Sequence, residues 1–290
     1  MNLAPHLIPY ISILQKLLPS DIAFRLTQLA GNSLSFFQKN RRNSLEYNLS
    51  RFGFNNVNEI SKNAIENWTI CVADQIATLW FSRKDLTMRI DDQGSKNLKE
   101  SLKLGKGVLL ITAHLGNYEI AGSYLAAQGF PIHAVVENIP GAHGHIFNRI
   151  RRKFGMQVVN YSNISRMFDI LRRKEILILL ADRALGKTGI SLRFGKSERL
   201  LPAGPAILAL RTGACIQTGY MVLNNNRRTY KLVIDPCFQP KLKNPNKVNH
   251  LRLSLSQKIA KILSSYIHKY PDQWFVFQNE WDKKQTDIDL

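Results

Sequence analysis

Two kinds of hydrophobic pattern follow one another along this chain of 290 residues. In the first ninety or so residues, apolar side chains recur at helical spacing, over 22–37 and again over 64–81. From Gly105 onward, short continuous apolar runs follow glycines or turn residues, which is typical of buried strands. The pattern therefore predicts a helical N-terminal region over 1–90, which we expect to associate with a membrane, and an α/β core over 91–290, joined as one continuous structural domain.

The core alternates predicted strands with predicted helices. We expect strands at 108–112, 132–136, 176–181, 190–194, 215–223 and 230–234, the last of them an outer strand. We expect helices after Gly116 and over 164–174, 205–211 and 248–270, the last ended by Pro271. This alternation predicts an α/β fold with a central mixed sheet flanked by helices.

The charge balance is strongly basic, with 40 Lys and Arg residues against 21 Asp and Glu residues, a formal charge of +19. Such a surface attracts nucleic acid, an anionic membrane leaflet or an acidic carrier protein. The basic clusters at 151–153 and 172–174 have no recognised nucleic-acid module around them and no interleaved aromatic side chains. We therefore expect no nucleic-acid partner; the clusters are either solvated helix faces or contacts for anionic membrane lipids or an acidic carrier.

The sequence predicts no transmembrane helix, since no run of about 18 apolar residues appears. The N-terminus also lacks the basic start and unbroken apolar stretch of a signal peptide. Residues 3–18 are rich in Leu and Ile, which fits either a helix in a membrane interface or a helix packed on the domain. Cys71, Cys215 and Cys237 form no Cys-x-x-Cys pair, so we expect a reducing compartment and neither a disulfide framework nor a zinc ribbon.

The candidate chemistry lies where the first predicted strand of the core ends. His114 follows this strand, and Glu119 comes five residues later. On one continuous helix, residues five apart differ by about 140° around the axis, so the two side chains meet only if His114 lies in a turn and Glu119 in the first helical turn. Gly116-Asn117 provides the permissive backbone for that turn.

This geometry suits a general base. The imidazole would remove a proton from an attacking hydroxyl, and the carboxylate on its other nitrogen would fix the tautomer and stabilise the imidazolium. A histidine and a glutamate five residues apart are also common by chance, so the surrounding sequence has to decide between the two interpretations.

The surrounding sequence resembles the lysophospholipid acyltransferase superfamily in five blocks that occur in the order of that family. The histidine-x4-acid motif comes first, and its Gly-Asn before an aromatic residue resembles the branch of bacterial lipid A late acyltransferases and phosphatidylinositol mannoside acyltransferases. The later blocks are 148–155, 179–183, 194–195 with 201–206 and 210–214, and 270–274.

The resemblance implies a glycerol-phosphate acyltransferase-like fold and transfer of a fatty acyl group from an acyl-carrier-protein or acyl-CoA thioester to a hydroxyl of a lipid or glycolipid acceptor. His114 is then the general base and Glu119 its orienting partner, with no acyl-enzyme. The thioester is the co-substrate, so we expect no further cofactor and no metal, and we place the protein at the cytoplasmic face of the inner membrane. The residues that the resemblance assigns to binding or shaping the substrate site are Asn117, Arg149, Arg152, Asp182, Arg183 and Gly204.

Three features depart from the family pattern. Ala184 stands where the third block has a second acid, and residues 278–280 stand where lipid A members carry His and Arg, which brings the chain closer to the mannoside branch. The N-terminus is also weaker than the spanning helix of lipid A members. Two other interpretations stay open: a thioesterase or lipid hydrolase that uses the same base on water, and a basic membrane-binding protein with a retired site.

Other catalytic motifs are weaker. Residues 185–188 lack the first glycine of a phosphate-binding loop, since Ala181 stands there. No Gly-x-Ser-x-Gly nucleophile motif occurs. The histidines within 133–145 have only Glu137 nearby as an acidic partner for a metal, so a solvent-facing loop is the simpler explanation.

Overall fold

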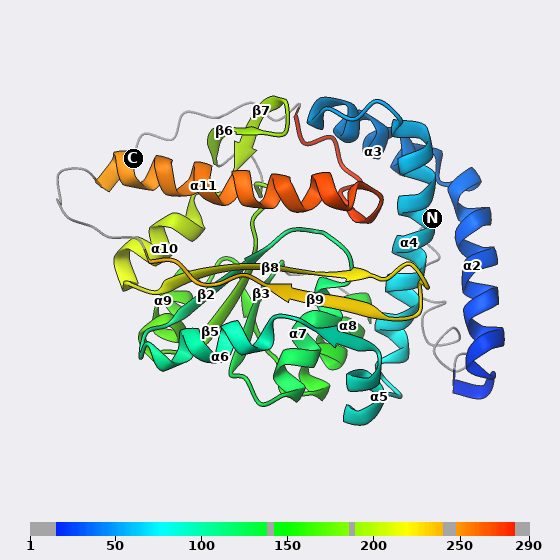
Figure 1. Cartoon of the computed structure of the whole chain (residues 1–290), viewed down its shortest axis with the longest axis horizontal. Helices are drawn as coiled ribbons and strands as arrows, with labels where there is room; N and C mark the ends of the chain where they lie inside the picture. The colour runs from blue at the N-terminus through cyan, green and yellow to red at the C-terminus, as the bar shows by residue number, and fades with distance from the viewer. Residues whose placement is uncertain (1–15, 138–141, 186–188, 240–247, 282–290) are drawn as a thin grey trace.

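The computed structural model (Figure 1) describes residues 16–137, 142–185, 189–239 and 248–281. Its centre is a seven-stranded sheet in the order β1-β9-β8-β2-β5-β3-β4. The bounds of these strands are β1 Ile90–Asp92, β2 Val108–Thr112, β3 Ile132–Val136, β4 Gln157–Asn160, β5 Ile176–Leu180, β8 Cys215–Leu223 and β9 Tyr230–Ile234. A separate antiparallel pair is formed by β6, Ile190–Phe194, and β7, Ser197–Leu201. The predicted α/β fold with a central mixed sheet is confirmed.

The middle strand of the sheet is β2. Its five residues are all buried, as expected of a parallel strand covered on both faces. It pairs in parallel with β8 on one side and with β5 on the other, and β3 and β4 continue the parallel arrangement beyond β5. β9 runs antiparallel to β8. It is not the outer strand that its alternation predicts, because the three-residue β1 pairs with it and takes the edge.

Helices cover both faces of this sheet. Their bounds are α6 Ser95–Lys103, α7 Tyr118–Ala127, α8 Ala142–Lys153, α9 Ile164–Arg172, α10 Gly204–Thr212 and α11 Val248–Lys269. α6 and α7 pack on one face, and α10 and α11 on the other (Figure 1). The sheet is thus the middle layer of three, which keeps its apolar strands away from water.

The path of the chain reverses beside β2. From β2 it continues through α7 to β3, whereas from β5 it returns through α10 to β8. Such a reversal in a parallel sheet leaves a crevice at the carboxyl ends of the strands, where reactive groups collect. β2 and β5 end at this edge in register, with Thr112 opposite Leu180.

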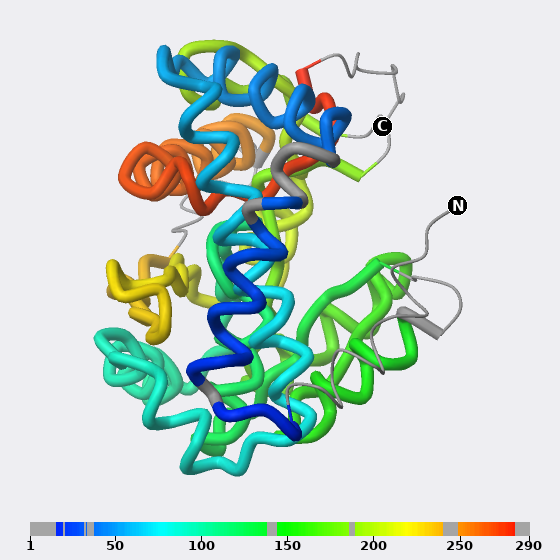
Figure 2. The backbone as a smooth tube through the Cα atoms, turned by 90° about the vertical axis from the view of Figure 1, so that its right-hand side faces the viewer, coloured from blue at the N-terminus to red at the C-terminus, as the bar shows by residue number. Residues whose placement is uncertain are grey.

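The N-terminal helices stand at the same edge. They are α2 Ser20–Phe37, α3 Lys39–Phe52, α4 Val57–Ala77 and α5 Arg83–Met88. α2 packs along the outside of α4 (Figures 1 and 2). In the part of the chain that the structure describes, no helix is long and apolar enough to cross a membrane. Most of the apolar stretch over 3–18 lies outside the described residues.

Candidate active site

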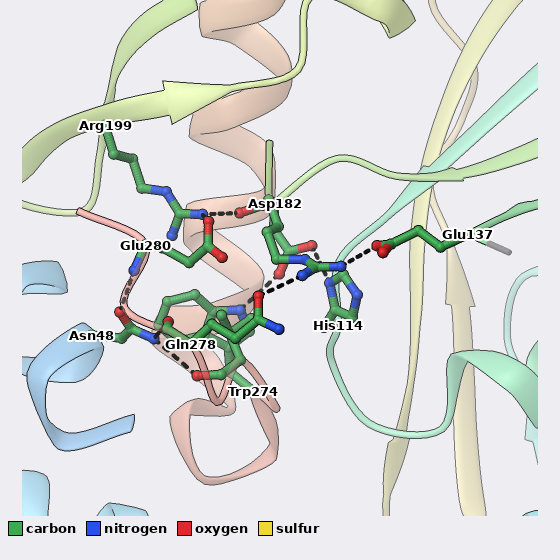
Figure 3. Close-up of polar contacts among 10 residues, drawn as sticks. Asn48, His114, Glu137, Asp182, Arg199, Trp274, Gln278 and Glu280 are labelled. Carbon is green, nitrogen blue, oxygen red and sulfur yellow. Dashed lines mark hydrogen bonds and ion pairs between the residues drawn. The ribbon is translucent and has the colours of Figure 1, made fainter. Parts of the chain in front are cut away.

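The site begins with two side chains that follow neighbouring parallel strands. His114 comes two residues after the end of β2, and Asp182 comes two residues after the end of β5. Because the two strands end in register, both side chains reach the same level at the same edge. Nδ1 of His114 lies 2.8 Å from Oδ1 of Asp182 (Figure 3). The structure therefore forms a histidine–carboxylate pair of the kind that supports a general base.

Asp182 is held on three sides. Its side chain is fully buried, and its second oxygen, Oδ2, accepts a hydrogen bond of 2.8 Å from the indole nitrogen of Trp274. Its backbone carbonyl accepts one of 2.5 Å from Nη2 of Arg199. Burial by itself raises the pKa of a carboxyl group, but His114, the indole N–H and Arg199 outweigh it and lower the pKa of Asp182 to about 2. Asp182 is therefore ionised at neutral pH.

Arg199, on β7, supports Asp182 from behind. Its side chain is fully buried and forms an ion pair of 3.2 Å with Glu280, which is equally buried (Figure 3). Burial lowers the pKa of Arg199 to about 10, against the opposing effects of Glu280 and Asp182, so the guanidinium stays charged at neutral pH. Glu280 is one of the residues that depart from the family pattern, and the structure places it in the wall behind the His114–Asp182 pair.

The C-terminal segment reaches this wall because α3 holds it. Asn48 of α3 is fully buried, and its amide nitrogen donates to the carbonyl oxygens of Val276 and Gln278 at 2.9 and 2.7 Å. Its amide oxygen accepts from the backbone N–H of Glu280 at 3.2 Å. Residues on both sides of this segment, Trp274 and Glu280, are thereby fixed against the site (Figure 3).

Glu119 does not make the hydrogen bond to His114 that we predicted. It lies in the first turn of α7 as expected, but the Tyr118 ring is what lies against His114, edge to face at 5.5 Å. Because neighbouring residues on a helix point about 100° apart, the Glu119 carboxylate faces elsewhere. It pairs with Arg151 of α8, whose Nε donates to Oε2 at 2.8 Å and whose Nη2 contacts Oε1. The predicted contact is wrong, and a catalytic role for Glu119 stays a prediction.

Arg151 is the buried member of the basic cluster on α8. Its side chain is 9% exposed, and Nη1 also donates to Asn148 at 3.0 Å. Burial opposes its charge, but the contact with Glu119 outweighs burial and raises the pKa of Arg151. The pair therefore joins α8 to the first turn of α7, the same turn whose Tyr118 packs on His114.

Three backbone hydrogen bonds clamp the turn that carries His114. The bonded pairs are His114 O with Phe275 N, Gly116 N with Gln273 O, and Asn117 N with Met221 O, at 2.8, 2.8 and 2.9 Å. Gly116 has a φ of +59°, and a Cβ atom there would overlap the carbonyl of Met221. The glycine of the motif is thus required by both backbone conformation and close packing.

Asn117 is buried, and its amide is used within the protein. Oδ1 accepts from the N–H of Ile120 at 3.2 Å and caps α7. Nδ2 donates to the carbonyl of Cys71 on α4 at 3.0 Å and to the Tyr230 hydroxyl at 3.2 Å. Asn117 therefore anchors the turn to α4 and β9. The substrate contact expected of it stays a prediction.

Arg183 directly follows Asp182 in the chain, and its side chain lies on a more open side of the site. It forms an ion pair with Glu137, which follows β3 and is 45% exposed, and Nη1 donates to Gln278 at 2.7 Å (Figure 3). These contacts hold the guanidinium of Arg183 between the residue that follows β3 and the C-terminal segment. Gln278, a second departure from the family pattern, is thus part of the site as well.

The other predicted substrate residues lie further out. Arg149 and Arg152 are exposed on α8, on either side of the buried Arg151. Gly204 is exposed at the start of α10, where a Cβ atom would meet nothing within 4 Å. The structure leaves these three on the surface, and their contacts with substrate stay predictions.

Two supporting residues had no individual role in the sequence interpretation. Trp274 carried a signal, since it stands in the C-terminal block, but the block does not say what its N–H binds. Arg199 carried none, because it belongs to no block and its partner Glu280 is distant in the chain.

The histidines considered as metal ligands have other surroundings. His133 is buried on β3, and its Nε2 lies 2.6 Å from Glu175. The side chain of His143 and residues 186–188 lie outside the described part of the structure. Among the described residues, no three His, Cys, Asp or Glu side chains are grouped as metal ligands would be.

Comparisons with known proteins point to one family. The sequence profile of the bacterial lipid A biosynthesis acyltransferases matches residues 7–283. The chain is 25% identical to the phosphatidylinositol mannoside acyltransferase of Mycobacterium tuberculosis over 194 residues, which are 65% of this chain and 58% of that protein. It is also 25% identical to the protein of the same name from Mycolicibacterium smegmatis over 191 residues, 64% of this chain and 60% of that protein. The chain thus spans less than two thirds of the length of these curated relatives.

Proposed function

The chain belongs to the family of bacterial lipid A biosynthesis acyltransferases, and from this premise we propose that it transfers a fatty acyl group from a thioester to a hydroxyl of a lipid acceptor. The observation that carries the proposal is the hydrogen bond between His114 and the ionised Asp182 at the carboxyl edge of β2 and β5. A base in this position serves direct attack by a hydroxyl, without an acyl-enzyme.

The tautomer follows from the bond. An ionised carboxylate only accepts hydrogen bonds, so Nδ1 of His114 carries the proton and Nε2 carries the lone pair. In the proposed reaction, Nε2 takes the proton of the acceptor hydroxyl as its oxygen attacks the thioester carbonyl carbon. The tetrahedral intermediate then expels the thiolate, and the His114 imidazolium gives its Nε2 proton to this leaving group. The products are an ester and a free thiol. Asp182 stabilises the transient imidazolium throughout.

The Glu119–Arg151 pair has a different place in this proposal. It holds the first turn of α7 against α8 and so keeps Tyr118 and His114 in position. The exposed Arg149 and Arg152 face the other way, and we assign them to the phosphate groups of a CoA or carrier-protein donor. Arg183 is placed to meet the acceptor or the donor beside the catalytic pair.

The acceptor is proposed to be a glycolipid of the inner membrane. The curated relatives are named for a phosphatidylinositol mannoside, and the C-terminal departures at Gln278 and Glu280 now lie at the site itself. Anionic lipids would attract the basic surface, which fits peripheral association with the cytoplasmic face. The thioester is the only co-substrate that the proposal needs.

The test is an acyl-transfer assay with purified protein, a long-chain acyl-carrier-protein or acyl-CoA thioester, and a bacterial lipid extract, read by mass spectrometry. We expect acylated lipid from wild type and a rate lower by about 10²- to 10⁴-fold in His114→Ala. His145→Ala, which removes an exposed histidine of α8, is the matched control and should keep full activity.

The rival interpretations give other products. Free fatty acid without acylated lipid would indicate a thioesterase or hydrolase. Lipid binding without any turnover would indicate a retired membrane-binding protein. Acyl transfer that persists unchanged in His114→Ala would overturn the mechanism.

A further inference from the structure

Tyr230, the first residue of β9, places a polar group in the interior beside the site. The residue is buried, and its hydroxyl donates to Oδ2 of Asp74 on α4 at 2.7 Å. The same oxygen accepts from Nδ2 of Asn117 at 3.2 Å. A buried hydroxyl costs free energy unless it is hydrogen-bonded, whereas phenylalanine fills the same space without that cost. The two partners therefore account for the hydroxyl, and one of them belongs to the turn that carries His114.

The proton of this hydroxyl is directed at Asp74. Both oxygens of Asp74 face donors, since Nη1 of Arg89 lies 3.4 Å from Oδ1. Burial raises the pKa of Asp74, and Arg89 and the Tyr230 hydroxyl act against this effect. Burial and the charge of Asp74 also raise the pKa of Tyr230, so the phenol keeps its proton. Because a carboxylate only accepts hydrogen bonds, Tyr230 gives its proton to Asp74 and has only a lone pair left for Asn117.

This direction fixes the orientation of the Asn117 amide. Nδ2 also donates to the carbonyl of Cys71 at 3.0 Å, so both groups on this side of the amide are acceptors. Oδ1 lies on the other side, where it accepts from the N–H of Ile120 at 3.2 Å and caps α7. A reversed amide would set Oδ1 against two acceptors and lose the cap. Asp74 and Tyr230 therefore determine how Asn117 binds the first turn of α7.

Asn117 is close to His114 along the chain. Two residues separate them, and the second of these is Gly116, whose left-handed backbone packs against the carbonyl of Met221. The N–H of Asn117 donates to that same carbonyl at 2.9 Å. A shift of Asn117 would therefore move the backbone from which the imidazole of His114 reaches Asp182.

The same helix carries a second buried pair of this kind. Tyr124 of α7 is buried, and its hydroxyl donates to Oδ2 of Asp92 at 2.9 Å. Asp92 ends β1, so this pair joins α7 to the edge strand of the sheet. Tyr124 lies about two helical turns after Asn117, away from the turn that carries His114. It provides a matched control for Tyr230.

We propose that Tyr230 and Asp74 are positioning residues, which hold His114 in place for catalysis by fixing the amide of Asn117. Neither residue touches substrate in this proposal. The inference rests on the proposed function, because the rate of acyl transfer is one of the quantities that test it. The competing explanation is that Asn117 acts only as a helix cap and that Tyr230 contributes only to stability.

The kinetic test is steady-state acyl transfer by the full chain with the thioester and lipid extract described above. We expect Tyr230→Phe to lower kcat by about tenfold, with the KM for the thioester unchanged. Tyr124→Phe should lose a similar free energy of unfolding in urea and keep the kcat of wild type. Asp74→Leu should match Tyr230→Phe, whereas Asp74→Asn should keep more activity, because its amide oxygen still accepts the proton of Tyr230.

Asn117→Asp separates the positioning role from the helix cap. Asp caps a helix as well as Asn does, so a residue that is only a cap predicts little change in kcat. The carboxylate has no proton for Tyr230 or Cys71, so the proposal predicts a loss at least as large as that of Tyr230→Phe. Asn117→Ala combined with Tyr230→Phe should be no slower than Asn117→Ala alone, because Tyr230 acts through Asn117.

The Nδ1–H proton of His114 gives a measurement that needs no turnover. Its NMR resonance, identified by its loss in His114→Ala, should move in Tyr230→Phe and Asn117→Asp and stay in place in Tyr124→Phe. An unchanged kcat and resonance in Tyr230→Phe would overturn the proposal, and so would an equal loss of kcat in Tyr124→Phe or a fully active Asn117→Asp. A chain that is inactive in every assay would refute the proposed function, and the resonance would still decide whether Tyr230 positions His114.

Discussion

Two carboxylates stand near His114, and they differ in almost every respect. Glu119 is five residues away in the sequence and turns its side chain to Arg151. Asp182 is 68 residues away, fully buried, and bonded to the imidazole itself. The carboxylate that contacts His114 is thus the one that is distant in the sequence, Asp182, and not the nearby Glu119.

The difference teaches that strand register can place groups more firmly than closeness in sequence. Parallel pairing of Thr112 with Leu180 brings the two following side chains to one level, whatever lies between the strands. A short turn into a helix is less decisive, because a change of one residue rotates a side chain by about 100°. Here that rotation gives Tyr118, and not Glu119, the face towards His114.

The largest loss of activity is expected from Asp182→Asn. The amide keeps the shape but can leave Nδ1 of His114 unprotonated, so that the base faces the substrate with the wrong nitrogen. We expect kcat to fall by about 10³- to 10⁴-fold with little change in KM. Steady-state acyl-transfer kinetics measure it. A residual activity close to wild type would show that Asp182 does not orient the base.

A smaller effect is expected from the other carboxylate. Glu119→Gln leaves the buried Arg151 without its charged partner and loosens the first turn of α7. A displaced catalytic geometry costs about 10²-fold in kcat. Loss of the charge-assisted hydrogen bonds should lower the free energy of unfolding by about 1–3 kcal/mol, which urea titration measures.

Arg151→Met separates the two possible roles of Glu119. If Glu119 acts through Arg151, the two single variants should lose similar activity, and the double variant should be no worse than either. The loss of activity from either variant should multiply with the loss from Asp182→Asn, since the Glu119–Arg151 pair and the His114–Asp182 pair share no residue. A nearly active Arg151→Met beside a Glu119→Gln as impaired as Asp182→Asn would instead restore direct orientation by Glu119.

Local patterns predicted most of the fold and one member of the His114–Asp182 pair. The strands at 108–112, 132–136, 190–194, 215–223 and 230–234 have the predicted bounds, because continuous or alternating apolar runs suffice to define them. His114 was found from its place after a strand. Asp182 belongs to the block at 179–183, but its partner depends on which strands are neighbours, and strand order is not a local property.

The residues that hold Asp182 in place were harder to predict for a similar reason. Arg199 and Glu280 meet only when the hairpin of β6 and β7 and the C-terminal segment are both folded. Trp274 needs the same return of the chain past the sheet. The spacing of His114 and Glu119 was predictive of a turn before a helix, which α7 confirms, but not of the direction in which the acid points.

The smallest expected effect, Trp274→Phe, tests how Asp182 stays ionised. The variant keeps an aromatic ring and removes the N–H that donates to Oδ2 at 2.8 Å. Loss of one hydrogen bond to a charged group should lower kcat/KM by about tenfold. Trp281→Phe is the matched control, since within the described structure its indole nitrogen is buried without a hydrogen-bond partner.

The pH dependence of stability is a second measurement of how Trp274 affects Asp182. The native pKa of Asp182 is lowered from 3.8 to about 2, so the group stabilises the fold above pH 4 and loses that contribution as the pH falls towards 2. The contribution is about 2 kcal/mol. Without the indole N–H the native pKa moves back towards 3.8, so Trp274→Phe should gain less stability between those pH values than wild type or Trp281→Phe. Urea unfolding at several pH values measures this slope, and an identical slope in all three proteins would mean that Trp274 packs against Asp182 without holding its charge.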